Sequence, residues 1–352
     1  MNQTASSSST ALCLLLTAAV FVQSQQPPNH APSPAERSST SPKNNPTLPS
    51  LEPSTTDSSD PELSNSELPT EYSDFTISKH VGEVNLILSV TDSKGRFVDN
   101  LTADDLKLLD NHKSPDKWNY FQARTNLPLH IILAIDVSSS IRDRLHFEQQ
   151  AASAFLKHVL RKETDEGAIV AFGSTVQDKT VHMTNDVDAL DATIHKLQAN
   201  GETAMYDAII AASGKLRQNR RNGVVRPVII LITDGVDTAS KMTLRAAEEA
   251  AARSEASIFA LDANSIYETD PKGRHVLEKL SRETGGFVLP ARENSDLKGA
   301  FSTIEKILRC QYALGYPPPD LEANGSFRPI EVIPNKQGLQ IHARNGYYAP
   351  AK

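Results

Sequence analysis

Between residues 127 and 309 the chain alternates short apolar runs with longer stretches whose apolar residues recur every three or four positions. Near-continuous runs of Ile, Val and Leu are typical of strands buried on both faces of a parallel sheet, and the longer period is typical of helices that cover such a sheet. The predicted strands are 131–135, 168–172, 225–232, 257–261 and 286–289, and the predicted helices lie near 145–160, 187–198, 204–218, 242–254, 273–283 and 295–309. We therefore expect an α/β fold in which helices cover both sides of a mostly parallel sheet.

One further apolar stretch, 176–183, follows the strand 168–172 after the tight turn Gly173-Ser174. A parallel connection needs a crossover of about a dozen residues, and this turn leaves no room for one. We therefore predict an antiparallel strand at the edge of the sheet.

Strand patterns with a two-residue period flank the α/β segment. Apolar and polar residues alternate in 83–91 before it and in 312–316 after it. Neither flank has enough strands to bury a face by itself. We therefore predict one small β domain built from residues 76–125 and 311–349, with the α/β domain, residues 127–309, inserted into it.

The first 74 residues have neither period. Residues 1–25 contain the uncharged apolar run 11–22 and a plausible small-residue cleavage site, Val22-Gln23-Ser24, as in a secretory signal. Residues 26–74 hold ten of the 21 prolines among Ser, Thr and Asn, a composition typical of a disordered tether. We expect a protein that is secreted or held in the periplasm or cell envelope, and the alternative is retention in the membrane by an uncleaved signal.

The charge is concentrated outside the part that is expected to fold. Residues 26–74 contain eight carboxylates and two basic residues, a net −6 of the formal −7 of the chain. The remainder is close to neutral, which argues against a nucleic-acid partner. Cleavage of the signal would leave Cys310 as the only cysteine. The mature chain would then have no internal disulfide and would depend on an ordinary apolar core.

Oxygen-bearing side chains gather where the predicted strands end. Asp136, Ser138 and Ser140 follow the strand 131–135, Asp234 follows 225–232, and Thr203 precedes a helix. In an open parallel sheet, ligands bind at the carboxyl ends of the strands. Two carboxylates and three hydroxyls form a hard, all-oxygen set that suits Mg²⁺, Mn²⁺ or Ca²⁺ and does not suit Zn²⁺.

Two alternative roles are open for these residues. Ser138 or Ser140 could act as a nucleophile, but the sequence contains no Gly-x-Ser-x-Gly, no HExxH and no histidine directly after a strand. The serines could also cap the helix that follows them. Of the nearby acids, we expect Asp207 to be a structural hydrogen-bonding residue, and Asp237 and Asp262 to be solvated loop carboxylates.

The set Asp136-x-Ser138-x-Ser140, Thr203 and Asp234-Gly235 resembles the metal-ion-dependent adhesion site of von Willebrand factor type A domains, and it matches in order at all five ligand positions. The flanks resemble those of secreted von Willebrand-related proteins of acidobacteria. The resemblance implies a Rossmann-like, doubly wound sheet of six strands, one of them antiparallel, with Mg²⁺ or Mn²⁺ at its carboxyl end. In integrin β subunits two further aspartates bind a second metal; here the corresponding residues are Asp143 and Arg144, so we do not expect one.

The function implied by this resemblance is divalent-metal-dependent binding of another protein, whose Asp or Glu completes the metal's ligands. We expect no enzyme activity, no nucleic-acid binding and no stable membrane insertion. The alternatives are a structural scaffold subunit of an envelope complex whose metal site is vestigial, and a metal-dependent hydrolase.

Overall fold

The computed structural model describes residues 82–123, 126–219, 223–263 and 271–351. The predicted signal (1–25), the predicted tether (26–74) and the first residues of the predicted β domain (76–81) lie outside the described residues. No helix of the described part is both long enough and apolar enough to cross a membrane.

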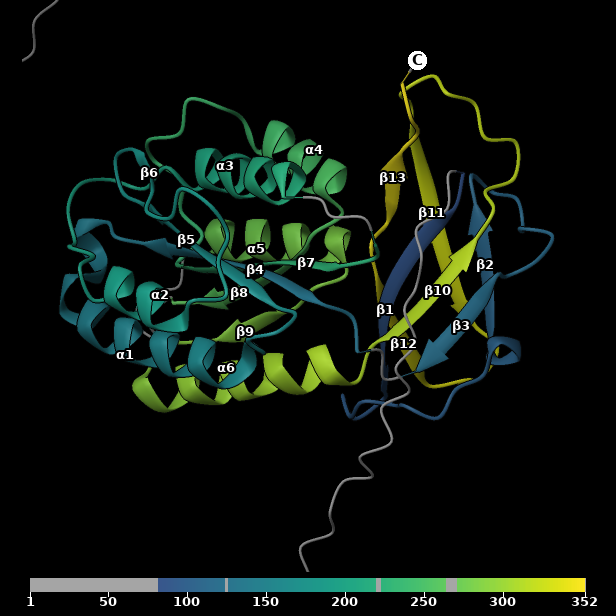
Figure 1. The fold of residues 1–352 in the computed structure, drawn as a ribbon, viewed down its shortest axis with the longest axis horizontal. Coiled ribbons are helices and arrows are strands. Elements are labelled where there is room, and N and C mark those ends of the chain that lie inside the picture. Colours follow the sequence, from purple (N-terminus) through teal and green to yellow (C-terminus); the bar gives the residue numbers. More distant parts are fainter. Residues whose placement is uncertain (1–81, 124–125, 220–222, 264–270, 352) are drawn as a thin grey trace, which may run out of the picture. The chain divides into compact units, whose positions relative to one another are not determined.

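A mixed sheet of six strands forms the centre of the α/β region, and the fold-class prediction is confirmed (Figure 1). In spatial order the strands are β6 (Val176–Asp178), β5 (Glu166–Phe172), β4 (Leu129–Asp136), β7 (Arg226–Thr233), β8 (Ser257–Asp262) and β9 (Val288–Pro290). All neighbouring strands are parallel except β5 and β6. Every residue of β4 is buried, because helices cover both faces of the sheet.

Six helices form the two covering layers (Figure 1). They are α1 (Arg142–Val159), α2 (Val187–Ile194), α3 (Met205–Gln218), α4 (Leu244–Ser254), α5 (Pro271–Thr284) and α6 (Asn294–Arg309). Apolar residues of α1, α2 and α6 pack with one face of the sheet, and those of α3, α4 and α5 pack with the other. Alternate residues of β4 enter the two cores: Ile131 and Leu133 face the first, and Ile132 and Ala134 the second.

The predicted edge strand is antiparallel, as expected, but it is shorter than the predicted range 176–183. Beyond Asp178 the side chain of Lys215, from α3, occupies the edge. Its Nζ lies 2.8 Å from Asp178 Oδ2 and donates to the carbonyl oxygens of Thr180 and Val181. The backbone N of Ile169, in β5, donates to the side-chain Oγ1 of Thr180, so a side-chain hydrogen bond takes the place of a ladder bond here.

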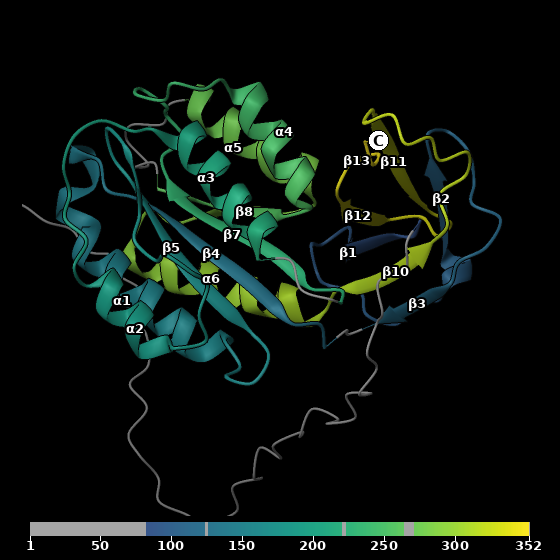
Figure 2. The same ribbon diagram turned by 45° about the horizontal axis from the view of Figure 1, so that its top comes forward.

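The strands that precede and follow the α/β region pair with each other (Figure 2). A four-stranded sheet has the order β12-β1-β10-β3, and a three-stranded sheet has the order β13-β11-β2. These strands are β1 (Val84–Asp92), β2 (Leu106–Asp110), β3 (Tyr120–Ala123), β10 (Tyr312–Tyr316), β11 (Phe327–Pro334), β12 (Leu339–Ala343) and β13 (Gly346–Tyr348). A 3-10 turn, Ala103–Asp105, precedes β2. Apolar residues from both sheets form one cluster.

A buried ion pair lies within this β region. Asp110, at the end of β2, accepts hydrogen bonds from Arg328 Nε at 2.9 Å, Tyr316 Oη at 3.1 Å and Tyr347 Oη at 2.8 Å. The three donors come from β11, β10 and β13. One carboxylate therefore joins β2 to strands that follow the α/β region.

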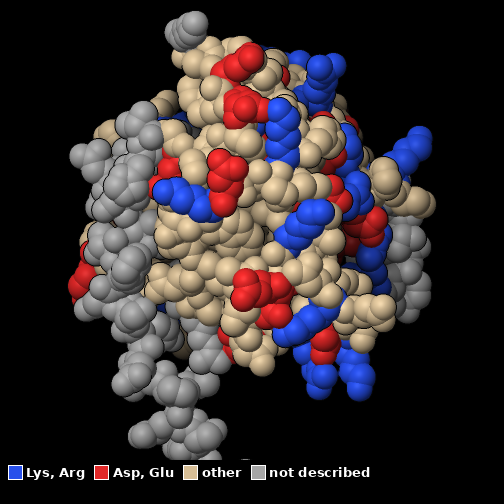
Figure 3. All heavy atoms as spheres, turned by 90° about the vertical axis from the view of Figure 1, so that its right-hand side faces the viewer, with Lys and Arg blue, Asp and Glu red and all other residues tan. Residues whose placement is uncertain are grey.

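Charges on the face of the β region that Figure 3 shows are of both signs and are interspersed. Within that view, the described Lys and Arg side chains form no continuous patch of the kind that binds a phosphate backbone.

Candidate metal centre

Asp136 is the last residue of β4, at the carboxyl end of the sheet, and only 1% of its surface is exposed. Its Oδ1 accepts a hydrogen bond from the backbone N of Ser138 at 2.8 Å, and its Oδ2 accepts one from Thr233 Oγ1 at 2.8 Å. Both donors are neutral. The site is therefore centred on a buried carboxylate whose two hydrogen bonds do not compensate its charge.

The two predicted serine ligands contact each other at 2.9 Å through their hydroxyl oxygens. Ser138 is buried and Ser140 is exposed. Ser138 precedes the 3-10 turn Ser139–Ile141, but its side chain makes no capping hydrogen bond. The capping alternative therefore fails for Ser138.

Thr203 is brought to the site by its loop. The backbone N of Ser139 donates to Gly201 O at 2.9 Å, and Gly201 N donates to Ser139 Oγ at 3.0 Å. Gly201 has φ +86°, and an added Cβ would lie 2.2 Å from Ser174 Oγ, so the contact requires glycine. The buried Thr203 is anchored on its other side, where its carbonyl oxygen accepts from Thr238 N at 2.9 Å.

Asp234 directly follows β7, the strand next to β4. It is partly buried, and its Oδ1 accepts a hydrogen bond from Val236 N at 3.0 Å. Gly235 has φ +83°, and a Cβ there would lie 2.5 Å from Gly273 O in α5. Glycine is therefore needed where the chain turns away behind Asp234.

Two buried carboxylates at this end of the sheet have raised pKa values. Burial raises the pKa of Asp136 to about 6; the hydrogen bonds from Ser138 and Thr233 oppose this shift, and the charge of Asp234 adds to it. Burial also raises the pKa of Glu148, in α1, to about 7, against the effect of Arg144 and with a contribution from Asp136. Each shift indicates that negative charge here is incompletely compensated.

Glu148 and Thr233 were not identified from the sequence. The signal for Glu148 is its position in α1, where it takes part in the buried face that includes Leu145 and Ala152. A carboxylate at such a position is uncommon unless it has a partner. Thr233 is the last residue of β7, one position before a predicted ligand, and a β-branched residue there carries no separate signal.

The other nearby acids have structural roles. Asp207 accepts hydrogen bonds from the backbone N of Lys241 and of Met242, each at 3.0 Å, so its predicted structural role is confirmed. Asp237 accepts from Tyr206 N at 3.2 Å and from Ser240 Oγ at 2.6 Å. The prediction that Asp262 is solvated is wrong, because Asp262 ends the buried strand β8 and is itself buried, 3.4 Å from Arg274 Nη1.

The structure thus connects all five predicted ligands to one end of the sheet, by different routes. Side-chain hydrogen bonds link Asp136, Ser138 and Ser140 into one loop, Gly201 joins the segment of Thr203 to that loop, and Asp234 acts on Asp136 through its charge. In the described part of the chain no group of three or more His, Cys, Asp or Glu residues is placed to hold a metal ion. This set contains only two carboxylates, and its other donors are hydroxyls. Such all-oxygen chemistry fits a hard divalent cation.

Solved structures that match this chain include "von Willebrand factor type A from Catenulispora acidiphila" (13% identity, 80% of this chain and 75% of that chain, TM-score 0.45). Others are the PilB minor pilin from Streptococcus sanguinis (14% identity, 52% and 61%, TM-score 0.44) and the conserved hypothetical protein BatB from Bacteroides thetaiotaomicron (18% identity, 51% and 98%, TM-score 0.42). The matched part therefore spans less than two thirds of the pilin chain. No curated protein matches the sequence.

Residues 131–236 match the family model described as "von Willebrand factor type A domain". The matched segment begins in β4, includes Asp136, Ser138, Ser140 and Thr203, and ends two residues after Asp234. The chain therefore contains a von Willebrand factor type A domain.

Proposed function

We propose that this protein is a divalent-metal-dependent protein-binding module whose metal captures a carboxylate of a partner. Domains of this type commonly mediate protein–protein interaction and are generally not enzymes. The observation that carries the proposal is the environment of Asp136: a carboxylate with 1% exposure, neutral hydrogen-bond donors and a second carboxylate, Asp234, nearby. A bound cation would supply the missing positive charge.

The residues that would hold the cation are Asp136, Ser138, Ser140, Thr203 and Asp234, with Mg²⁺ or Mn²⁺ preferred and Ca²⁺ as an alternative. The two aspartates carry −2, which balances a divalent ion formally, and the three hydroxyls are neutral. Mg²⁺ releases water reluctantly, so a ligand from outside has to bring negative charge of its own. An Asp or Glu side chain of another protein does this, and a neutral amide does not.

The proposed partner is an acidic residue of a secreted or envelope protein. This location is supported by the signal-like segment 1–25, and residues 26–74 would provide reach. The second candidate, a scaffold subunit with a vestigial site, keeps the fold and needs no metal. A hydrolase with a serine nucleophile is disfavoured, because the Ser138 and Ser140 hydroxyls contact each other and, among the described residues, no hydrogen bond joins either of them to a histidine.

Calorimetric titration with Mg²⁺ tests the site directly. Asp136→Ala should abolish or strongly weaken binding and leave the fold largely intact, because the apolar strand that ends at Asp136 is unchanged. Asp143→Ala is the matched control, since it removes an exposed carboxylate from the first turn of α1. It should leave Mg²⁺ affinity close to that of the unaltered protein.

A pull-down from envelope extract, with Mg²⁺ and then with EDTA, tests the partner. A true partner should be lost in EDTA and should fail to bind Asp136→Ala. Changing the partner's acid to its amide should remove most of the affinity. Equal binding in Mg²⁺, in EDTA and to Asp136→Ala would support the scaffold function and reject the metal contact.

A further inference from the structure

One side chain beside the candidate metal centre fastens three elements together. Arg144, in the first turn of α1, donates from Nη1 to the carbonyl oxygen of Ala263 and from Nη2 to that of Ala291 at 2.7 Å. Its Nη2 also lies 3.2 Å from Glu148 Oε1, one turn further along α1. Ala263 directly follows β8 and Ala291 directly follows β9, so the guanidinium ties the start of α1 to the ends of two strands.

These contacts continue to the candidate ligands. The backbone N of Ala263 donates to Thr233 O at 2.9 Å, and Thr233 Oγ1 donates to Asp136 Oδ2 at 2.8 Å. On the other side, α1 begins at Arg142, two residues after Ser140. A closed set of contacts therefore runs from Asp136 through Thr233, Ala263 and Arg144 back to the loop of the two serines.

Glu148 has no evident role except in this arrangement. Its side chain is 1% exposed, and its carboxylate oxygens accept no hydrogen bond of good geometry, so the ion pair with Arg144 is its one direct polar contact among the described residues. Burial of a carboxylate is unfavourable unless a partner compensates it. A purely structural position in α1 would be served better by an apolar residue.

We propose that Arg144 and Glu148 form a positioning pair, which holds the Asp136–Ser140 loop against the sheet in the arrangement that binds the cation. The inference rests on the metal-dependent function proposed above and adds a determinant of metal affinity to it. Neither residue contacts the metal in this proposal. Arg144 acts through the carbonyl groups that it holds, and Glu148 acts by keeping the guanidinium in place.

The direction in which metal affinity changes when Arg144 is replaced distinguishes positioning from simple electrostatics. Arg144 carries a positive charge near a cation site, so Coulomb repulsion alone predicts that its removal strengthens metal binding. Loss of positioning predicts the opposite, because ligands that are no longer held have to be ordered when the metal binds. Arg144→Gln should therefore weaken binding of Mg²⁺ or Mn²⁺, by about 10- to 100-fold as for other residues that orient metal ligands.

Arg142→Gln is the matched control. Arg142 is exposed in the same turn of α1, makes no side-chain hydrogen bond or ion pair with the described residues, and loses the same charge in the variant. Its metal affinity should stay the same or rise slightly. Arg144→Lys should recover part of the loss, since an ammonium keeps the charge but lacks the planar fork that spans two carbonyl groups.

A double-mutant cycle tests whether the two residues act as a unit. If they do, Arg144→Gln combined with Glu148→Gln should weaken metal binding little more than Arg144→Gln alone. Additive losses in the cycle would contradict a pair. Thermal unfolding of each variant in EDTA, followed by circular dichroism, confirms that the compared proteins are folded.

Hydrogen exchange in EDTA gives a readout that does not depend on the metal. Amides of the loop 137–141 and of the first turn of α1 should exchange faster in Arg144→Gln than in Arg142→Gln. If the unaltered protein binds no divalent cation, the proposed function fails, whatever the exchange shows. If it binds and Arg144→Gln binds equally well or more tightly, the positioning pair is rejected and the proposed function stands.

Discussion

Two buried aspartates lie at opposite ends of the same strand and have opposite electrostatic environments. Asp136 ends β4, and Asp165 accepts a hydrogen bond from the backbone N of Leu129, where β4 begins. Their exposed fractions are 1% and 0%. The pKa of Asp136 is raised to about 6, whereas that of Asp165 is lowered from its ordinary value. The difference therefore comes from the partners, since both residues are buried.

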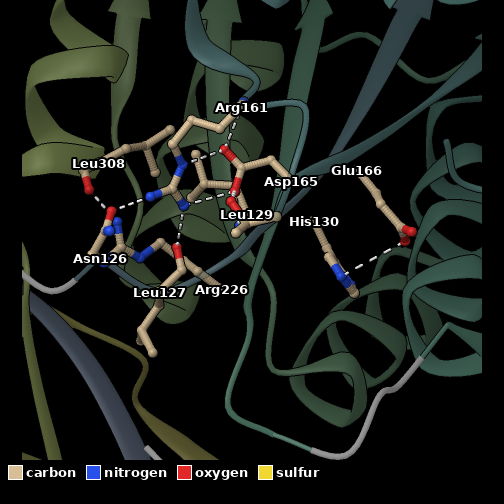
Figure 4. A network of polar contacts seen from close by, with 10 residues as sticks. Asn126, Leu127, Leu129, His130, Arg161, Asp165, Glu166, Arg226 and Leu308 are labelled. Atoms are coloured by element: carbon tan, nitrogen blue, oxygen red, sulfur yellow. Dashed lines mark hydrogen bonds and ion pairs between the residues drawn. The ribbon is translucent and has the colours of Figure 1, made fainter. Parts of the chain in front are cut away.

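Asp165 has an internal cation, Arg161 (Figure 4). Its Oδ1 accepts from Arg161 Nη2 at 2.7 Å, and its Oδ2 accepts from Arg161 Nε at 2.9 Å and from the Arg161 backbone N at 3.0 Å. Burial alone would raise the pKa of Asp165, but these hydrogen bonds outweigh it. Such a bidentate arrangement is among the stronger charge-assisted contacts in proteins.

The amino end of the sheet is positive elsewhere too. Arg226, at the start of β7, donates to the carbonyl oxygen of Leu308 (Figure 4). Burial first, and then the charges of Arg161 and Arg309, lower its pKa to about 9. Among the described residues, Asp165 thus has a cation bonded to its carboxylate, and Asp136 has none. Burial by itself therefore does not distinguish the two aspartates, whereas the presence of a bonded cation does.

The largest expected effect comes from replacing aspartate by asparagine at each end of β4. Asp165→Asn should lower the free energy of unfolding by about 3 kcal/mol or more, because it leaves the Arg161 guanidinium without its carboxylate. Asp136→Asn in EDTA should not lower it, since an amide can still accept from Ser138 N and donate to the Thr233 hydroxyl. Urea unfolding measures both. Equal destabilisation at the two ends would remove the distinction.

The pH dependence in EDTA sharpens the comparison. The folded-state pKa of Asp136, about 6, lies above the ordinary value of 3.8, so its ionisation disfavours the folded state as the pH rises between these values. Asp136→Asn avoids this penalty. From pH 4 to pH 7 the variant should gain at most about 2.4 kcal/mol of stability relative to the unaltered protein.

The stability contribution of Asp165 changes with pH in the opposite direction. Its lowered pKa contributes stability above the unfolded pKa, and this contribution is lost only as the pH falls through the folded-state value. The profile of Asp165→Asn should therefore run parallel to that of the unaltered protein between pH 5 and pH 7. Glu148 is present in every protein compared, so most of its own titration cancels. Parallel profiles for Asp136→Asn as well would contradict the raised pKa.

The smallest expected effect concerns Thr233. Thr233→Val removes the hydroxyl that donates to Asp136 Oδ2 and keeps the branched shape of the side chain. The pKa of Asp136 should rise further, and the free energy of unfolding at pH 7 in EDTA should fall by about 1 kcal/mol. Thr233→Ser, which keeps the donor, is the control. Carbon-13 NMR of the Asp136 carboxyl group measures the pKa directly.

The positions of Asp136 and Asp234 at the carboxyl ends of strands could be anticipated because local sequence carries them. Each apolar run that became β4 or β7 is followed at once by its aspartate, and parallel strands bring their carboxyl ends to one edge. The contacts of Arg144 could not be anticipated, because they reach backbone carbonyl groups 119 and 147 residues away. Carbonyl groups have no sequence signature.

The length of the edge strand also could not be predicted from local sequence. The turn at Gly173-Ser174 predicts an antiparallel β6, but the contacts beyond its end include Lys215, which lies on a helix 34 residues beyond Val181. The ion pair of Asp165 is different, since Arg161 lies only four residues before it. The tertiary contact at Leu129, however, had no signal in the sequence.

The two connections between the β region and the α/β region determine how a mechanical force would be transmitted through the protein. Leu127, just before β4, packs with Ala313 of β10, which follows α6 after only Cys310 and Gln311. The chain thus enters and leaves the α/β region at one place. A pull on a partner held at Asp136 would act along the length of β4 and load its evenly spaced hydrogen bonds to β5 and β7 together. β4 is preceded in the chain by β3, an edge strand, and α6 is followed by β10, which lies between β1 and β3, so the force would be shared between an edge strand and an interior strand of one sheet.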